Sequence, residues 1–225
     1  MFTKQVPSWI PLGGLALTSA AGCINAVGFL SLDHHAISHM SGNVTVLGLE
    51  LGRADYAGAM RTLTVLLCFF FGCLLSGLII RESTLRLGRR YGVALACEST
   101  LLVFATWYLR HGQHLGVYLA AMACGLQNAM ATGYSGAVVR TTHMTGIVTD
   151  LGIAVGLWAR RQPVDWRRMR LYLVLLLGFF VGSGLGAVGF AHFHYDTLLF
   201  PAALTGFGGI VYGIYKHRTR RAGPH

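Results

Sequence analysis

The stretch His39-Met-Ser-Gly-Asn-Val-Thr-Val-Leu-Gly-Leu-Glu-Leu-Gly52 recurs later in the chain as His143-Met-Thr-Gly-Ile-Val-Thr-Asp-Leu-Gly-Ile-Ala-Val-Gly156, at an offset of 104 residues. Eight of the fourteen positions are identical. Upstream, Asn25-Ala26 matches Asn128-Ala129, and downstream the Phe-Phe pair at 69–70 matches the pair at 179–180. Because these features follow in the same order, the sequence predicts an internal repeat, with repeat one at about 9–109 and repeat two at about 115–215.

The composition around this repeat is that of a membrane protein. The 225 residues are 54% hydrophobic and 12% charged, with a mean hydropathy of +0.56, whereas a soluble domain needs far more surface charge. The formal net charge of +10 comes from short basic clusters between apolar runs, a pattern that argues against a nucleic-acid-binding protein. The five cysteines lie inside apolar stretches without disulfide or metal-ligand spacing, so we predict no metal site and no cofactor.

Six apolar runs reach the length of about 20 residues that a helix needs to cross the hydrocarbon layer. They are roughly 9–32, 63–80, 91–109, 115–139, 171–191 and 197–215. Two further runs, 41–51 and 144–159, are shorter or more polar, which is typical of re-entrant or partial helices. The first run is interpreted as a retained span rather than a secretory signal, because apolar sequence continues past Cys23. The connections are short and charged, so we expect one all-α membrane domain over 1–225.

The distribution of Lys and Arg predicts the orientation. Six spans place 15 of these residues on one side and 3 on the other, whereas eight spans give 13 and 5. The positive-inside rule therefore favours six spans with both termini in the cytoplasm, although eight spans remain an alternative.

Three spans per half is an odd number, so the second half enters from the opposite side. Inverted repeats of this kind recur among secondary transporters, which bind solutes near the midplane where interrupted helices meet. A duplication kept for packing alone is the other interpretation.

Four motifs resemble the paired signatures of the YoaK-like small transmembrane proteins. They are Asn-Ala-Val-Gly-Phe-Leu at 25–30, His-Met-Ser-Gly-Asn at 39–43, Leu-Gln-Asn-Ala at 126–129 and Arg-Thr-Thr-His-Met-Thr-Gly at 140–146. The resemblance covers nearly the whole chain and implies a bacterial inner-membrane protein, but it implies no substrate. One departure is Ile147, which stands where the first half has Asn43.

Polar residues inside or beside the apolar runs are the candidates for solute binding. Amides in a span either join neighbouring helices or line a cavity where the helix unwinds. Ser or Thr followed by Gly favours the start of each short helix, where free amides attract anions, and a nearby arginine adds positive charge. The predicted solute-binding residues are Asn25, His39, Ser41, Gly42, Asn43, Gln127, Asn128, Arg140, His143, Thr145 and Gly146.

Three carboxylates, Glu50, Glu98 and Asp150, fall inside apolar stretches. An ionised side chain there costs about 3 kcal/mol or more unless it is paired or hydrated. With His39 and His143 on the same helix faces as Glu50 and Asp150, they suit proton uptake and release. Glu50 and His39 are equally well explained by contact with water at the segment ends. Glu98 is equally well explained as an acceptor for amides freed near a proline in the last span.

Small residues at fourfold spacing predict close helix packing at 48 and 52, at Gly72 and Ser76, at 152 and 156, and along 178, 182 and 186. No enzyme motif occurs, so we do not predict an enzyme. The predicted function is binding or transport of a small polar solute, coupled to protons, with the lipid bilayer as surroundings, and a homo-oligomer is compatible with the sequence. The alternative is a non-transporting accessory protein that binds a partner or lipid.

Overall fold

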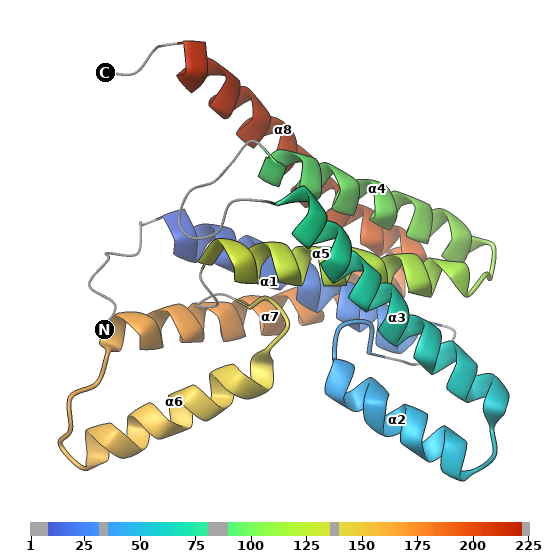
Figure 1. Ribbon diagram of the computed structural model, residues 1–225, viewed down its shortest axis with the longest axis horizontal. Helices are drawn as coiled ribbons and strands as arrows, with labels where there is room; N and C mark the ends of the chain where they lie inside the picture. Colours follow the sequence, from blue (N-terminus) through green and yellow to red (C-terminus); the bar gives the residue numbers. More distant parts are fainter. Residues whose placement is uncertain (1–8, 32–35, 81–89, 136–139, 222–225) are drawn as a thin grey trace.

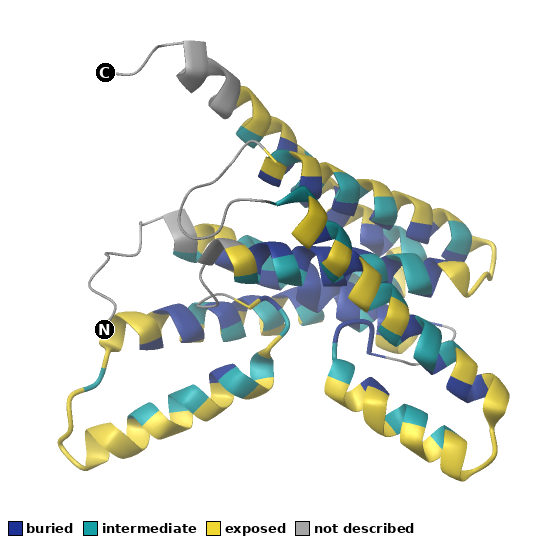
Figure 2. Cartoon of the chain, viewed as in Figure 1, coloured by how far each residue is buried: buried dark blue, intermediate teal, exposed yellow. Residues whose placement is uncertain are grey.

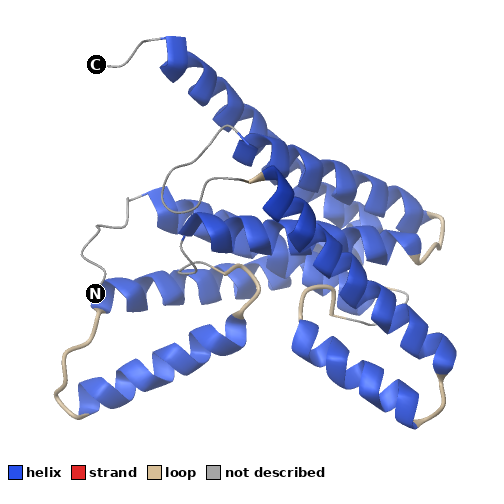
Figure 3. Ribbon diagram, in the orientation of Figure 1, coloured by secondary structure: helices blue, strands red, loops and turns tan. Residues whose placement is uncertain are grey.

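The computed structural model of the protein describes residues 9–31, 36–80, 90–135 and 140–221. Within these ranges the chain is helical and contains no strand, as Figure 3 shows. The elements in chain order are α1 (Trp9–Leu30), α2 (Met40–Gly52), α3 (Tyr56–Ile79), α4 (Arg90–Arg110), α5 (Leu115–Ser135), α6 (Met144–Ala159), α7 (Trp166–Phe193), the 3-10 helix η1 (His194–Leu198) and α8 (Leu199–Arg221). The all-α prediction is confirmed for these residues. Positions 136–139, which end the fourth predicted run, lie outside them.

Helices α3 and α7 begin before the apolar runs that mark them at 63 and 171. Each begins behind an aspartate. The side chain of Asp55 accepts a hydrogen bond from the Gly58 backbone amide at 2.9 Å, and that of Asp165 accepts one from Arg168 at 3.2 Å. A carboxylate at this position satisfies free amides and complements the positive end of the helix dipole. The start of each helix is therefore set by its cap rather than by its apolar residues.

The helices pack in three close pairs, α1 with α7, α3 with α5, and α4 with α8, and α4 also lies along α5. Helices α1 and α5 are the most enclosed, as the dark centre of Figure 2 shows. Ile24 and Val27 of α1 and Ala120, Cys124 and Leu126 of α5 are all 0% exposed. The outer helices instead expose large apolar side chains. A continuous apolar exterior of this kind marks a surface that faces lipid or another protein.

Glycines set the distance between α1 and α7. A Cβ atom at Gly22 would overlap the Phe179 carbonyl oxygen, and one at Gly182 would overlap that of Ser19. Ser183 also donates a hydrogen bond from Oγ to the Gly22 carbonyl oxygen at 3.2 Å. The two backbones touch here because neither glycine has a side chain.

The α3–α5 pair has a second crossing of the same kind. A Cβ atom at Gly125 would overlap the Phe69 carbonyl oxygen, and one at Gly72 would overlap that of Met122. The Cys73 thiol donates a hydrogen bond to the Gly125 carbonyl oxygen at 3.2 Å. Close packing is thus confirmed at Gly72, Gly178, Gly182 and Gly186, while Gly22 and Gly125 were not predicted.

The glycines of the two short helices behave differently. The prediction of close packing is wrong for Gly48, Gly52, Gly152 and Gly156, because nothing lies within 4 Å of a Cβ atom at any of them. Helix α2 packs on α3 and helix α6 on α7, and among the described elements neither has another neighbour. In Figure 1 the first residues of α2 and α6 lie towards the middle of the molecule, and the two helices diverge outward, α6 to the lower left and α2 to the lower right.

Four stretches of the described residues are long and apolar enough to cross a membrane: Pro11–Leu30, Tyr56–Ile79, Arg90–Arg110 and Trp166–Ile214. The last of these contains α7, η1 and α8. Helix α6 is a shorter apolar helix. Helix α5, which carries Gln127 and Asn128, is not among the four stretches. Because α5 is enclosed by other helices, its amides need not face lipid.

Candidate functional site

The side chain of Asn25, near the C-terminal end of α1, holds the segment that leads into α2. Its Oδ1 accepts a hydrogen bond from the Ser38 backbone amide at 3.0 Å, and its Nδ2 lies 3.1 Å from His39 Nε2. From the first turn of α2, Asn43 donates through Nδ2 to the Ala36 carbonyl oxygen at 2.7 Å. Both amide side chains are buried. We call Asn25, Ser38, His39 and Asn43 the Asn25 cluster.

The direction of the hydrogen bond between Asn25 and His39 fixes the charge of the histidine ring. Because Asn25 Oδ1 is occupied by Ser38, the Nδ2 group faces the ring as a donor, so Nε2 of His39 must be an unprotonated acceptor. Burial also lowers the pKa of His39 from its ordinary value of 6.5, since the charged ring would lose its hydration. The ring stacks on Phe179 of α7 with 5.7 Å between centroids.

The matching residues of the second half are arranged differently. Asn128 Oδ1 is buried and has no hydrogen-bond partner among the residues that the structure describes. His143 is exposed, and Ile147, in the place of Asn43, is buried. In the second half, the oxygen of the Asn128 side chain thus has no described partner, whereas in the first half both polar atoms of the Asn25 amide have one.

Both short helices begin one residue before the predicted Ser or Thr, with His39 and His143 as the capping positions. Neither histidine makes a side-chain capping hydrogen bond. The first amides of α2 and α6 are thus left to water or to a ligand. Arg140, four residues before the start of α6, is exposed. Among the other predicted residues, Ser41, Gly42 and Thr145 are exposed in the first turns and Gly146 lies beneath the His143 ring.

Asp150 has a charged partner at the surface between α6 and α7. Its Oδ2 lies 3.4 Å from Arg168 Nη2, and Arg168 Nε donates to the Tyr172 hydroxyl at 2.7 Å. Both charged side chains are about half exposed, at 42% and 52%. Sequence analysis missed Arg168 and Tyr172, although their spacing of four residues on one helix face is a detectable signal. The carboxylate of Asp150 is therefore paired with the guanidinium group of Arg168.

Glu50 lies half-buried at the end of α2, close to Asp55 and Gly58 at the start of α3. One of its carboxylate oxygens, Oε2, is buried and has no hydrogen-bond partner in the described part of the chain. The connection at 53–55, which follows α2, is exposed.

Glu98 lies in the interior, on the face of α4 that packs against α5. Its side chain is 0% exposed. Neither of its carboxylate oxygens has a hydrogen-bond partner within the described ranges. The amide-acceptor interpretation thus finds no such bond, and Pro201 stands in the first turn of α8, where a missing amide leaves no carbonyl unpaired.

The α5 turn level with Glu98 includes two polar side chains, Cys124 and Gln127. Gly116 of α5 lies against Ala105 of α4, and because the two helices are antiparallel, Glu98 comes level with the turn at 123–127. Cys124 is the α5 side chain close to Glu98 in this turn. Gln127 donates from Nε2 to the Leu17 carbonyl oxygen of α1 at 3.0 Å, while its buried Oε1 has no partner among the described groups.

We call Glu98, Cys124 and Gln127 the Glu98 cluster. Predicted residues of the first half meet in the Asn25 cluster, whereas Glu98 and Gln127 come level on facing helices and share no hydrogen bond among the described groups. Helices α2 and α6 do not contact each other over the residues described, so a single site built from both HisMet segments stays a prediction. No group of three or more His, Cys, Asp or Glu side chains that could hold a metal ion is found in the described ranges.

Comparison with known proteins places this arrangement in a family. Residues 13–211 match the model of a family described as "Protein of unknown function (DUF1275)". The chain is 26% identical over 198 residues to UPF0700 transmembrane protein YoaK of Bacillus subtilis (strain 168), covering 84% of this chain and 87% of that protein. It is 32% identical over 180 residues to UPF0700 transmembrane protein RA0705 of Rhizobium meliloti (strain 1021), covering 78% of this chain and 75% of that protein. No solved structure matches. The YoaK-like resemblance is confirmed, and the chain is a membrane protein that belongs to the DUF1275 family.

Proposed function

We propose that the protein binds a small polar solute and moves it across the bacterial inner membrane, with Glu98 carrying the coupled proton. The observation that carries this proposal is the complete burial of Glu98 with both oxygens unpaired among the described groups. A buried polar group without a partner costs about 1–3 kcal/mol, and an ionised one costs more. Buried carboxylates inside membrane helices mark ion and proton pathways more often than packing.

The halves 9–109 and 115–215 form an inverted repeat in this proposal. The two glycine crossings support it, because each takes one helix from each half: α1 with α7, and α5 with α3. Gly22 and Gly125 are 103 residues apart, as are the matching asparagines. The hydrogen bond from Ser183 to the Gly22 carbonyl oxygen has its counterpart in that from Cys73 to Gly125.

The directions of the paired helices support six spans, with α2 and α6 entering only part of the bilayer. Gly92 of α4 faces Gly209 of α8, whereas Ser99 donates to the Ala202 carbonyl oxygen, so α4 and α8 are antiparallel. If α6 crossed fully, α4 and α8 would run in the same direction. Successive residues of α7 contact successive residues of α1 in the same order, so the two helices are parallel. This arrangement requires that α2 and α6 either both cross the bilayer or both stop short of crossing it. With six spans, the charge count favours a cytoplasmic location for both termini.

Unequal packing of the two halves supports movement between two states. Helix α4 lies along α5, but the matching contact of α8 with α1 is much smaller. Gly116 is pressed against Ala105 and Leu109 of α4, whereas nothing lies within 4 Å of a Cβ atom at Gly13, its counterpart 103 residues earlier. A transporter built from inverted repeats exchanges such contacts when its site opens to the other side.

The helix ends favour an anionic or zwitterionic solute. The first amides of α2 and α6 have no side-chain cap, and the positive ends of the two helix dipoles lie towards the middle of the molecule (Figure 1). Arg140 adds a cation before α6. The Asn25 cluster holds the start of α2 in place.

A thermal-unfolding screen of the detergent-purified protein tests the proposal. Small metabolites and inorganic ions are added at two pH values on either side of the ordinary histidine pKa. A ligand that binds only the folded state raises its stability by about 2.7 kcal/mol at roughly a hundredfold excess over Kd. We expect a pH-dependent hit that Glu98→Gln makes pH-independent and that Thr100→Val, an exposed change two residues along α4, leaves intact. An unchanged pH profile in Glu98→Gln removes its proton role.

The second candidate function is an accessory protein that packs against a partner in the bilayer. The open glycines at fourfold spacing on α2 and α6 favour it, because small residues at this spacing form helix-docking faces: Gly48 with Gly52, and Gly152 with Gly156. In that case Gly48→Leu and Gly156→Leu should abolish the protein's activity in cells, whereas neutral replacements of Glu98 and Asp150 should not. Solute transport predicts the reverse pattern.

A further inference from the structure

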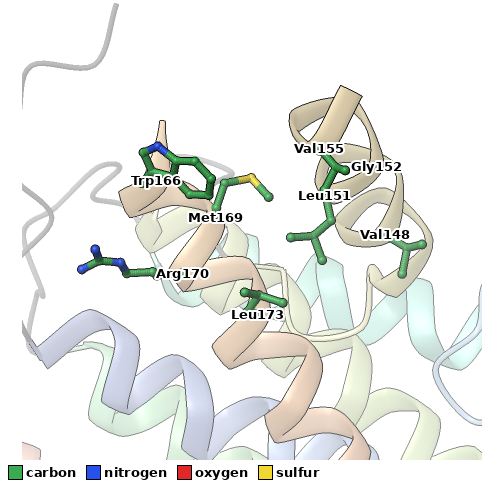
Figure 4. A pocket seen from close by; sticks show the side chains of 8 residues that line it. All are labelled: Val148, Leu151, Gly152, Val155, Trp166, Met169, Arg170 and Leu173. Atoms are coloured by element: carbon green, nitrogen blue, oxygen red, sulfur yellow. The ribbon is translucent and has the colours of Figure 1, made fainter. Parts of the chain in front are cut away.

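An apolar groove of about 550 Å³ runs between α6 and α7 (Figure 4). One wall comes from Val148, Leu151 and Val155 of α6, and the other from Met169 and Leu173 of α7. The α6 wall extends over 148–155 and the α7 wall, with Trp166, over 166–173, each about 10 Å along its helix. Gly152 lines the α6 side, and nothing lies within 4 Å of a Cβ atom there. The groove is therefore elongated and apolar, as an acyl chain is.

The end of the groove nearest the α6–α7 turn is strongly basic. The turn and the helix ends beside it carry Arg160, Arg161, Arg167, Arg168 and Arg170, all of them exposed. The only acidic side chain between positions 160 and 170, Asp165, is engaged in capping α7. Arg168 pairs with Asp150, but the other four arginines have no carboxylate partner in the described part of the chain.

Arg170 joins the two parts of this surface. It lines the groove, and Figure 4 shows its guanidinium group pointing away from the apolar walls. Trp166, at the same end, has the amphipathic ring that is typical of the membrane interface. A ligand that fits both parts has an apolar chain and a negatively charged head.

We propose that this groove is a binding site for an anionic phospholipid of the leaflet that faces the α6–α7 turn. One acyl chain lies between α6 and α7, and the phosphate lies at Arg170 and its unpaired neighbours. Basic pockets between membrane helices bind anionic headgroups in this way. The α2–α3 hairpin, which matches it in the repeat, carries Arg53 and Arg61 but no comparable cluster, so the site belongs to the second half.

Thermal unfolding in detergent with added lipid tests the site. We expect phosphatidylglycerol to stabilise the protein at lower concentrations than phosphatidylcholine with the same acyl chains. Arg170→Gln should leave the lipid-free stability unchanged and weaken phosphatidylglycerol binding by about fivefold, since one basic side chain near an anionic headgroup contributes about that much. Native mass spectrometry should retain phosphatidylglycerol on the wild type and less of it on the variant.

Gly152→Leu provides the test of the groove itself. The open space at Gly152 accepts the new side chain, so the variant should fold but lose the preference for phosphatidylglycerol. Gly48→Leu is the matched control, because Gly48 stands at the same repeat position on α2, is equally open, and should keep the preference. Equal effects of the two lipids on the wild type, or equal stabilisation by soluble glycerol phosphate, overturn the proposal. An unchanged preference in both Arg170→Gln and Gly152→Leu does so as well.

Discussion

Glu98 lowers the stability of the fold in order to place a carboxyl group in its interior. Leucine has a similar volume and no polar atoms, so Glu98→Leu should raise the free energy of unfolding by about 1–3 kcal/mol, because it removes two buried oxygens that lack partners among the described residues. Chemical unfolding in detergent measures this difference. Leu102→Ala, on the same buried face, should lower the free energy of unfolding by about 2–5 kcal/mol. A destabilised Glu98→Leu variant would reveal a structural partner for the carboxyl group.

His39 should make the stability of the protein depend on pH. Burial lowers the pKa of His39 below its unfolded value of 6.5, so protons bind the unfolded chain more readily than the folded one. Its contribution is complete above 6.5 and is lost as the pH falls from there through the folded pKa. Protonation also removes the acceptor that Asn25 needs. Melting temperatures measured across this range should show the loss, which is about 1.4 kcal/mol for a tenfold difference in proton affinity between the two states.

The matched variants for this effect are His39→Gln and His192→Gln. A glutamine at position 39 offers an oxygen to Asn25 and does not titrate, so the pH-dependent loss should disappear. His192 is exposed, and its replacement should leave the loss in place. If His39→Gln kept the same profile, another group would be responsible for it.

At the scale of single helices, the glycine crossings and the open glycines predict opposite effects of the same mutation. Gly182→Ala should destabilise the protein by about 1–3 kcal/mol, because the new methyl group overlaps the Ser19 carbonyl oxygen. Gly184→Ala, two residues along α7, should stabilise it by about 0.5–1 kcal/mol, because nothing lies within 4 Å and alanine favours the helix. Thermal unfolding of both variants measures the two changes in stability. Equal changes would contradict the close contact of α1 with α7 at Gly182.

Apolar run lengths predict the helices well, because a span needs a minimum length of apolar residues whatever it packs against. They do not predict where α3 and α7 begin, since Asp55 and Asp165 start those helices within polar sequence. The spacing of glycines does not reveal which of them are in contact. Gly48 and Gly182 both belong to fourfold patterns, but only Gly182 faces another backbone, and that depends on which helix is its neighbour.

The candidate site was predicted unevenly for the same reason. Motif similarity identified Asn25, His39 and Asn43, which are close in sequence and meet in one cluster. The Glu98 cluster joins α4 to α5 and, through Gln127, to α1, so it depends on tertiary packing. Its charged member was found only because a carboxylate in an apolar run is unusual. The ion pair that balances Asp150 comes from a helix start that the apolar pattern missed.

For the molecule as a whole, the proposed exchange of contacts gives Gly13 a role that its surroundings do not reveal. Gly13→Leu should leave stability nearly unchanged, because the site is open in this structure. It should nevertheless block the state in which α8 lies along α1, as a leucine at Gly116 would block the present contact with α4. Flux of a solute found by the screen should therefore fall in Gly13→Leu and persist in Gly184→Leu, which is equally open. Unimpaired flux in Gly13→Leu would exclude the exchange.

The number of spans also makes a prediction for the whole molecule. With six spans, the connection at Arg53 and that at Gln113 face outward, whereas Gln162 faces the cytoplasm; with eight spans, all three face the cytoplasm. Single cysteines at these exposed positions, in a chain whose five natural cysteines are replaced, should be tested in intact cells with a membrane-impermeant maleimide. We expect labelling at 53 and 113 and none at 162 until the cells are lysed. Protection at both 53 and 113 would instead require α2 and α6 to cross the bilayer fully, and the antiparallel packing of α4 with α8 could not then persist in the membrane.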